Sequence, residues 1–499
     1  MTYVEYKQLN PFQRFAYNFK KTASGIPQAV SKFFKGLVSA IVGFFTGIVN
    51  GFKNYGSTFV KGDWATKLSY IIFGVGDISK GKYYKGILFF LVEVFYIYFM
   101  VTFGGGYISK FGTLGTVETQ IVPDGKFTKT VFGDNSMLIL LYSVLTIVVT
   151  IVVFAVYIAN IKDAYAMQKL RAKGGKPTSL KHDIQEFLDG KYHITLLSFP
   201  VLMISVFNIL PLIFMILIAF TNYDKQHLPP GTLFTWVGFD NFSSVFDIVD
   251  NAVKAKTFLE LTQWTLIWAV AATFTNYILG MVVALMINKK GIKLKALWRT
   301  LFVITIAVPQ FVSLLLVNQL LQTDGALNIL LGYIMGGNPH IQFLNSTPLM
   351  ARMTVIIVNC WVGIPYTILS MSGILMNIPE DLYESARIDG AGPVKTFTAI
   401  TLPYMLFVTT PQLITQFVGN INNFNVIYLL TNGGPTNPDY YNAGHTDILV
   451  TWLFKLTMGN AQDYKLAAAI GILVFIVCAT ISLIVFNSSK SMKDEEAFS

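Results

Sequence analysis

Uninterrupted apolar runs of roughly 20 residues constrain this chain most, because a helix needs about 20 apolar residues to cross the hydrocarbon core of a bilayer. Eight such runs predict transmembrane helices at about 86–104, 137–160, 194–219, 262–288, 300–321, 352–376, 403–430 and 465–487. Soluble domains carry about 25% charged residues, whereas only 13% of these 499 residues are charged. The chain is therefore predicted to be an all-α polytopic membrane protein surrounded by lipid.

The basic residues are distributed unevenly between the segments that join the predicted spans. Twenty-eight of the 37 Lys and Arg residues lie in 1–85, 161–193, 289–299, 377–402 and 488–499, which share one side of the membrane if the spans alternate. The positive-inside rule places that side, and with it both termini, in the cytoplasm. The net charge of +10 thus reports topology, and it gives no reason to expect a nucleic-acid partner.

The N-terminal region contains basic residues but no apolar stretch of the signal-peptide kind, so we expect no cleaved leader. Apolar residues at helical spacing then predict an amphipathic helix that lies in the membrane interface. These residues are Phe34, Leu37, Val38, Ile41, Phe44, Phe45 and Ile48. The alternative is a further transmembrane segment, in which the small residues between them form a helix contact.

Four regions follow from these patterns. We predict a basic N-terminal region at 1–65, two accessory transmembrane helices at 66–190, a transmembrane core at 191–490 and a cytoplasmic tail at 491–499. Prolines lie within spans of the core at Pro200, Pro211, Pro309, Pro365 and Pro411. Proline bends a helix, and a membrane tolerates the bend only where protein or water satisfies the freed backbone groups. Bent helices around a cavity are the first interpretation, and simple packing kinks are the second.

Few charged or nucleophilic residues lie inside the spans. Glu93 is the only charged residue well inside one, and Cys360 and Cys478 both lie in apolar runs. Neither a metal cluster nor a catalytic acid–base pair is indicated, and a glycosyl-transferring enzyme would need paired carboxylates that the sequence does not offer. We therefore predict no catalytic residue, no bound metal and no enzymatic activity for this chain.

Neutral amides and aromatic residues occupy the later spans instead. Amides offer donors and acceptors to sugar hydroxyls, and aromatic rings lie against the apolar faces of pyranose rings. Gln416, Asn420 and Asn423 are spaced i, i+4 and i+7 on one predicted helical face, and Gln310 and Asn359 lie in neighbouring spans. A sugar pathway is one interpretation. The other is that the amides only join helices, for about 1 kcal/mol each.

The segment between the sixth and seventh predicted spans has too many helix signals for a linker. Pro379 suits a first helical position, with Glu380 and Asp381 in the positive first turn. Gly390 can adopt the positive φ of a C-terminal cap, and Pro393 can begin a second helix that ends before Pro403. Leu382 and Ala386 share a face, with Tyr383 beside them, so either a partner or the chain's own helices should cover this strip.

This segment resembles a loop found in a known family. The pattern Glu-x-Ala-x-x-x-Gly followed by Ile-x-Leu-Pro matches Glu384, Ala386, Gly390, Ile400, Leu402 and Pro403. It is similar to the loop of permease subunits of bacterial ATP-binding-cassette (ABC) importers, with Ser385 where alanine is usual. The resemblance implies the type I ABC importer permease fold, a short helix that docks on a cytoplasmic ATPase, Glu384 as its polar contact and Gly390 as the turn.

A closer resemblance, over about 190–490, is to the larger, eight-span permease subunit of maltose/maltodextrin importers. It is carried by residues 357–366, 422–424, 430–435 and 466–470. It implies sugar contacts at Asn359, Gly363, Tyr366, Asn420 and Asn423. Ile306, Gln310, Gln416 and Gly419 differ from the residues usual at lining positions, so the resemblance does not specify the glycan.

The resemblance also implies an assembly. Its parts would be a second related permease, two ATPase subunits that bind ATP and Mg²⁺, and an extracellular sugar-binding lipoprotein, with no cofactor on this chain. No P-loop of the form G-x-x-x-x-G-K-[ST] occurs here. The short outer loop at 220–261 implies a Gram-positive-type system. An importer of another oligosaccharide or of a small solute such as a glycerol phosphate is the alternative, although no Arg or Lys lies well within the later spans.

Overall fold

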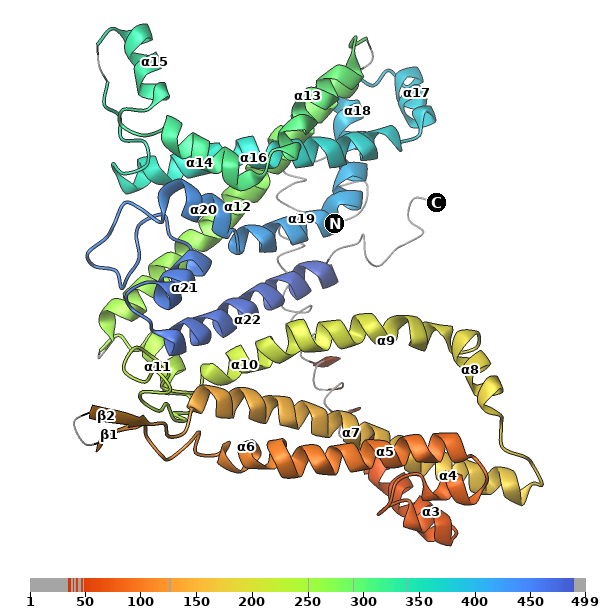
Figure 1. Cartoon of the computed structure of the whole chain (residues 1–499). Coiled ribbons are helices and arrows are strands. Elements are labelled where there is room, and N and C mark those ends of the chain that lie inside the picture. The colour runs from red at the N-terminus through yellow and green to blue at the C-terminus, as the bar shows by residue number, and fades with distance from the viewer. Residues whose placement is uncertain are drawn as a thin grey trace. The chain divides into compact units, whose positions relative to one another are not determined.

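The computed structural model describes residues 49–124, 127–249, 251–289, 291–337 and 339–488, with scattered positions between 35 and 47. The predicted interfacial helix at 34–48 lies mostly outside the described residues. Among the described residues, seven helical segments are long and apolar enough to cross a membrane (Figure 1). They are Tyr83–Lys110, Ser136–Ala172, Tyr192–Ile218, Ala252–Asn288, Pro348–Met376, Pro393–Thr431 and Tyr464–Ile484. The predicted all-α membrane fold is therefore confirmed.

The predicted fifth span, 300–321, is not one continuous helix. The structure has α13 (Lys295–Ala307) and α14 (Gln310–Leu320) with a 90° bend between them. Val308 and Pro309 have extended backbones at the break, because proline lacks the N–H that would continue the helix and disfavours a helical residue before it. The two helices make an eighth span only if the bent pair is counted as one.

By internal packing the chain divides into two units. Of the described residues, the accessory unit contains those within Gly36–Asn241 and Asp463–Ala469, and the core unit contains those within Phe242–Gln462 and from Ile470 to Ser488. The third span thus packs with the accessory helices, although the sequence grouped it with the core. The predicted boundary between the accessory helices and the transmembrane core, at 190/191, stays a prediction.

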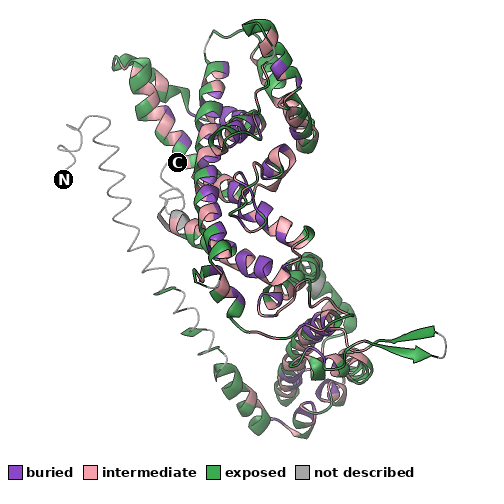
Figure 2. Ribbon diagram, turned by 90° about the vertical axis from the view of Figure 1, so that its left-hand side faces the viewer, coloured by how far each residue is buried: buried purple, intermediate pink, exposed green. Residues whose placement is uncertain are grey.

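The accessory unit is built from helices and one hairpin. Its elements are α3 (Trp64–Leu68), α4 (Val75–Ser79), α5 (Tyr83–Phe99), η1 (Met100–Gly104), α6 (Gly105–Lys110), β1 (Gln120–Asp124), β2 (Phe127–Val131), α7 (Ser136–Ala172), α8 (Leu180–Leu188), α9 (Tyr192–Ile204), η2 (Ser205–Ile209) and α10 (Leu210–Ile218). α5 and α7 pack side by side, with the Tyr96 hydroxyl donating to Thr150 Oγ1 over 3.1 Å. β1 and β2 pair antiparallel, and both of their faces are exposed (Figure 2).

The core unit is organised around the long helix α12. After α11 (Asp240–Phe246) it contains α12 (Ala252–Asn288), α13, α14, α15 (Ala326–Met335), α16 (Pro348–Met376), α17 (Glu380–Ile388), α18 (Pro393–Thr396), η3 (Phe397–Thr401), α19 (Leu402–Ile421), α20 (Phe424–Thr431), α21 (Leu449–Met458) and most of α22 (Tyr464–Ser488). Trp264 and Trp268 of α12 pack in one apolar cluster with Leu314, Val355 and Ile427. These contacts join α12, α14, α16 and α20 and fix where their polar residues lie.

Candidate functional site

The segment at 379–403 forms the predicted helix and turn. α17 begins at Glu380, with Pro379 as its N-cap rather than its first residue. Gly390 has φ +70°, its N–H donates to the Arg387 carbonyl, and the N–H of Ala391 donates to the Ala386 carbonyl. This pair of bonds is a Schellman motif, which needs a residue with positive φ after the helix. The predicted cap at Gly390 is therefore confirmed.

The second helix does not end before Pro403, so that prediction was wrong. α18 continues through the π-helix η3 directly into α19, with Pro403 near the first residue of α19. A π-turn is wider than an α-turn. It can accommodate a proline ring that would clash with the carbonyl four residues earlier. Residues 379–403 are thus continuous with a membrane-spanning helix.

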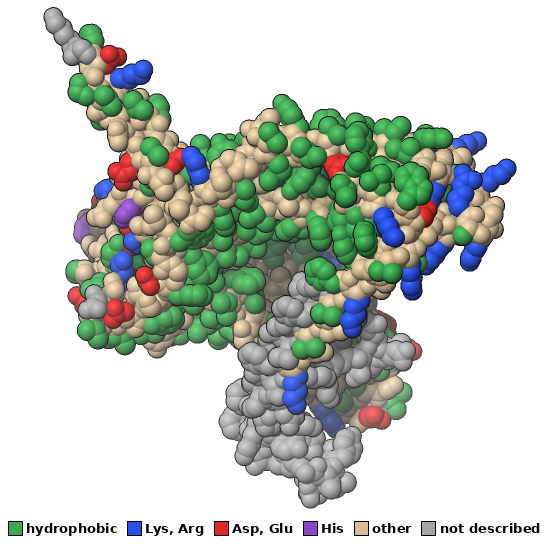
Figure 3. All heavy atoms as spheres, turned by 90° about the horizontal axis from the view of Figure 1, so that it is seen from below, with side chains coloured by type: hydrophobic (Ala, Val, Ile, Leu, Met, Phe, Trp, Pro, Cys, Tyr) green, Lys and Arg blue, Asp and Glu red, His purple; other side chains and the backbone are tan. Residues whose placement is uncertain are grey.

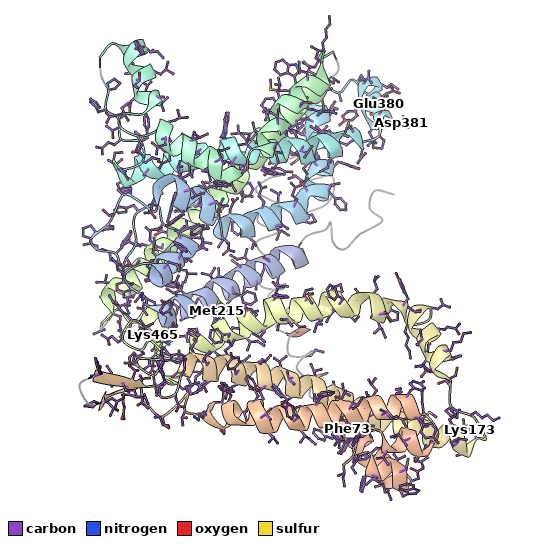
Figure 4. The ribbon with its side chains drawn as sticks, viewed as in Figure 1. Phe73, Lys173, Met215, Glu380, Asp381 and Lys465 are labelled. Carbon is purple, nitrogen blue, oxygen red and sulfur yellow. The ribbon has the colours of Figure 1, made fainter. Side chains whose placement is uncertain are left out.

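α17 presents an acidic and partly apolar surface. Glu380, Asp381 and Glu384 lie on it, and Figure 4 places the first two at one end of the core unit. Glu384 is exposed and its carboxylate is 3.8 Å from Arg387. Leu382 is exposed too, whereas Ala386 is only half-exposed. The predicted strip is therefore partly uncovered.

Tyr383 faces the chain's own helices. Its hydroxyl lies 3.0 Å from Thr401 Oγ1 in η3, and its ring is half-buried. This bond ties α17 to the π-turn at the start of α19. A force on α17 would therefore reach α19 through a side-chain contact as well as along the backbone.

The two interrupted helices of the core meet at their breaks. α14 begins at Gln310, just after the 90° bend, and α20 begins at Phe424, just after the break that ends α19. Asn425 Nδ2 donates to Gln310 Oε1 over 3.3 Å across this junction. Discontinuous spans mark substrate sites in many transporters, because helix N-termini there direct free N–H groups toward the ligand. We name Gln310 and residues 422–425 the break junction.

The predicted face of Gln416, Asn420 and Asn423 is not formed. Gln416 and Asn420 lie on α19, but Asn423 follows its end and caps α20, with Oδ1 accepting from the Val426 N–H over 3.3 Å. Asn420 is buried and donates to Thr273 Oγ1 over 2.9 Å. The break shifted Asn423 off the α19 face, and it occurs where successive amides compete for backbone hydrogen bonds.

The residues predicted on α16 divide between two environments. Asn359 is buried, and a Cβ added at Gly363 would lie 2.0 Å from Asn276 Nδ2 of α12. Both residues therefore belong to the contact between α12 and α16. Tyr366 and Trp361 are exposed on the same helix, so these two aromatic rings are the ones that present a free face.

Asn276 was missed from the sequence. Its Oδ1, like Asn359 Nδ2, is buried with no hydrogen-bond partner among the described residues. One atom is an acceptor and the other a donor, and burying such an atom unpaired costs roughly 1–3 kcal/mol. The available signal was a lone amide in the middle of the apolar run at 262–288. Asn425 of the break junction was also missed, although it lies beside the amides that were singled out.

The loop at 431–448 is ordered around a buried carboxylate. Asp447 is fully buried. Its oxygens accept from the Gly444 N–H over 2.7 Å, from Thr451 Oγ1 over 2.8 Å and from Lys455 Nζ over 2.6 Å. Gly433 has φ +78°, and a Cβ there would lie 2.1 Å from Asp447 Oδ1. The loop is therefore held rigidly by contacts within the chain.

Comparison with known proteins places this architecture in a family. Residues 276–492 match the family described as binding-protein-dependent transport system inner membrane component. The chain is 36% identical over 428 residues to the galactooligosaccharides transport system permease protein GanP of Bacillus subtilis (strain 168), covering 85% of this chain and 97% of that protein. It is 33% identical over 432 residues to the maltodextrin transport system permease protein MdxF of the same organism, covering 85% and 95%.

A further relative matches only part of the chain. Identity to the maltose/maltodextrin transport system permease protein MalF of Escherichia coli (strain K12) is 37% over 281 residues, 55% of this chain and 52% of that protein. The chain therefore belongs to the family of permease subunits of binding-protein-dependent ABC sugar importers. It is a polytopic membrane protein and a permease rather than an enzyme, as predicted.

Proposed function

We propose that this chain forms half of the translocation pathway of an ABC oligosaccharide importer and couples that pathway to a separate ATPase. The observation that carries the coupling is α17, an exposed helix closed by the Schellman motif at Gly390 and continuous through η3 with α19. ATP and Mg²⁺ would be bound by the ATPase, with no cofactor on this chain.

The charge of α17 supports an electrostatic fit to its partner. Residues 380–389 contain four carboxylates and one arginine, so a groove lined by basic residues would complement it. Closure of two ATPase subunits would push α17 and, through the Tyr383–Thr401 contact, move the start of α19. The closed ATPase pair would bind one of the two states of the permease, inward-open or outward-open, more tightly than the other, and would therefore favour that state.

We propose a neutral oligosaccharide as the substrate. Gln310 at the break junction, Gln416 on α19 and the exposed rings of Trp361 and Tyr366 offer amide hydrogen bonds and aromatic faces, which suit hydroxyls and pyranose rings. Asn420 and Asn423 would serve indirectly, by holding the break where helix N-termini face the pathway. A second permease would supply the other half of the cavity.

Maltodextrins and galactooligosaccharides are the two candidate substrates. The resemblance at 357–366 favours a maltodextrin, while the relative at 36% identity is named for galactooligosaccharides and the one at 33% for maltodextrin. An extracellular binding protein would deliver the sugar to the outer face.

Both termini would be cytoplasmic, because the basic residues gather in the segments on that side of the membrane.

Uptake of radiolabelled glycans by the complete reconstituted importer tests the proposal. A panel of maltotriose, maltotetraose, a galactooligosaccharide and a glycerol phosphate is presented with the binding protein and internal ATP. We expect accumulation of one neutral oligosaccharide class that requires ATP hydrolysis. Accumulation of glycerol phosphate alone would refute the neutral-sugar proposal, and uptake without ATP hydrolysis would refute the coupling.

A further inference from the structure

Glu93 and Asn160 are two polar residues within or at the ends of the apolar accessory helices α5 and α7. A carboxylate in hydrocarbon is costly and usually marks a functional contact. Here Glu93 Oε2 accepts from the backbone N–H of Phe73, and Asn160 Oδ1 accepts from the N–H of Gly74, both over 2.8 Å. Both side chains therefore bind the backbone of one preceding turn, Phe73–Gly74.

This turn is the tip of a hairpin formed by residues 63–82, which we name the 63–82 hairpin. Asp63 at its start and Lys80 near its end form an ion pair of 3.2 Å, which closes the base. Asn160 Nδ2 also donates to the Ser69 carbonyl over 3.0 Å. The first arm is thus held against α7 on its way to the tip.

Glycine allows the hairpin to lie directly on α5. Gly74 has φ +80°, and a Cβ there would lie 1.9 Å from the carbonyl oxygen of Gly86. A Cβ at Gly76 would lie 2.4 Å from Cβ of Ala164 on α7. Backbone contact this close on two sides holds the tip in one place, so its position along α5 and α7 can be read from its partners.

The tip lies beyond the polar ends of both helices. The ion pair between Lys85 and Asp163, at 2.6 Å, marks where the apolar runs of α5 and α7 end. Glu93 is eight residues further along α5, about 12 Å, and a helical side chain leans back toward the N-terminus by up to one turn. The Phe73 ring also stacks on Tyr157 of α7, with 5.2 Å between centroids. Gly74 lies against Gly86, one residue beyond Lys85, so Phe73–Gly74 lies roughly 4–6 Å past the ion pair, at the edge of the apolar layer.

The exposed surface of the hairpin carries large apolar side chains, with basic side chains beside them. Trp64 and Ile71 are 70% and 73% exposed. Lys61 and Lys67 are exposed as well, and Figure 3 shows Lys and Arg gathered at one end of a hydrophobic surface. The acidic residues of the hairpin are Asp63, which is paired with Lys80, and Asp77, which is fully buried. Positive charge beside apolar side chains complements a leaflet of anionic lipid.

We propose that the 63–82 hairpin is a re-entrant element that enters the basic-side leaflet, with Ile71 among acyl chains and Lys61 and Lys67 at the headgroups. Non-helical backbone at this depth must have its polar groups satisfied by protein. The Glu93 and Asn160 hydrogen bonds do this for the tip. Glu93 is then a structural acceptor, and it needs no role in an ion pathway.

Site-directed spin labelling of the full chain in phosphatidylcholine vesicles containing phosphatidylglycerol tests this. Cys360→Ser and Cys478→Ala give the background for Ile71→Cys and for the control Ile121→Cys, on the exposed hairpin β1–β2, where the native residue is 71% exposed. We expect oxygen to reach the label at 71. The accessibility of the label at 71 to a nickel chelate should be at least about tenfold lower than that of the label at 121. A free-energy cost of 1.4 kcal/mol for bringing the polar chelate to the label is enough to give this factor.

Two results would overturn the proposal. Equal nickel access at 71 and 121 would place the hairpin in water, and protection of 71 from both reagents would mean that a protein partner covers it. With the label at 71, Glu93→Leu should raise nickel access, because the Phe73 N–H loses its acceptor, whereas Glu93→Gln keeps an acceptor and should not. A Leu variant with unchanged access would refute the role of Glu93.

Discussion

Reversing the charge of Glu384 is the sharpest perturbation of the proposed coupling helix. Its carboxylate is 61% exposed and lies 3.8 Å from Arg387. Exposed pairs of this kind contribute about 0.2–1 kcal/mol to folding. Glu384→Lys should therefore leave membrane insertion and thermal unfolding nearly unchanged. Any large loss of transport must then arise in the contact with the ATPase.

The expected loss follows from the energetics of charge at interfaces. Truncating one partner of a buried charged contact costs about 2–5 kcal/mol, and like charges add repulsion. At 1.4 kcal/mol per decade, docking should weaken by roughly 30-fold to several thousandfold. ATP-dependent uptake and co-purification of the ATPase should both be lost, and a basic-to-acidic change in the facing groove should restore part of each.

The matched control reverses an exposed carboxylate that is not part of α17. Glu118→Lys lies in the exposed loop before β1 and should retain uptake and ATPase binding. Normal uptake by the Glu384→Lys complex would refute the docking assignment. Equal losses in both variants would trace the effect to net charge rather than to α17.

Three further perturbations test other parts of the structure. Asn423→Leu should raise the half-saturating sugar concentration roughly 3–10-fold, because the lost α20 cap, equivalent to one hydrogen bond, no longer holds the break in place; unchanged uptake at limiting sugar would mean that the cap does not shape the pathway. Burial opposes the ionised form of Asp224, but hydrogen bonds from Lys465 and His227 outweigh it and lower the pKa of Asp224 to about 2. About 2 kcal/mol of stability, present above pH 4, should therefore be lost as the pH falls toward 2; thermal unfolding of Asp224→Asn should lack this dependence. Gly433→Ala should destabilise the loop at 431–448 by more than about 1–2 kcal/mol, whereas Gly419→Ala, which meets no atom within 4 Å, should not; equal melting temperatures would contradict the steric argument.

Features set by neighbouring residues were predictable from the sequence. The start of α17 near Pro379, the positive φ of Gly390 and the start of α18 at Pro393 all follow from local backbone chemistry. The 90° bend at Pro309 was not predictable, because proline interrupts a helix without fixing the direction in which the chain continues. That direction depends on Leu314 packing against helices distant in sequence.

Amides in apolar runs have two physical uses that sequence alone cannot separate. A broken helix in a bilayer leaves backbone groups that only protein can satisfy, so polar side chains gather at breaks whether or not a ligand binds there. Asn318 donates to the Leu430 carbonyl over 2.6 Å, and Asn423 caps α20. The side chain of Gln416 instead forms no hydrogen bond with another residue in the part of the chain that the structure describes, and Tyr366 has an exposed ring. Sugar specificity should therefore respond more to Gln416 and Tyr366 than to the capping amides, because their contacts with a ligand would not compete with contacts that hold the fold.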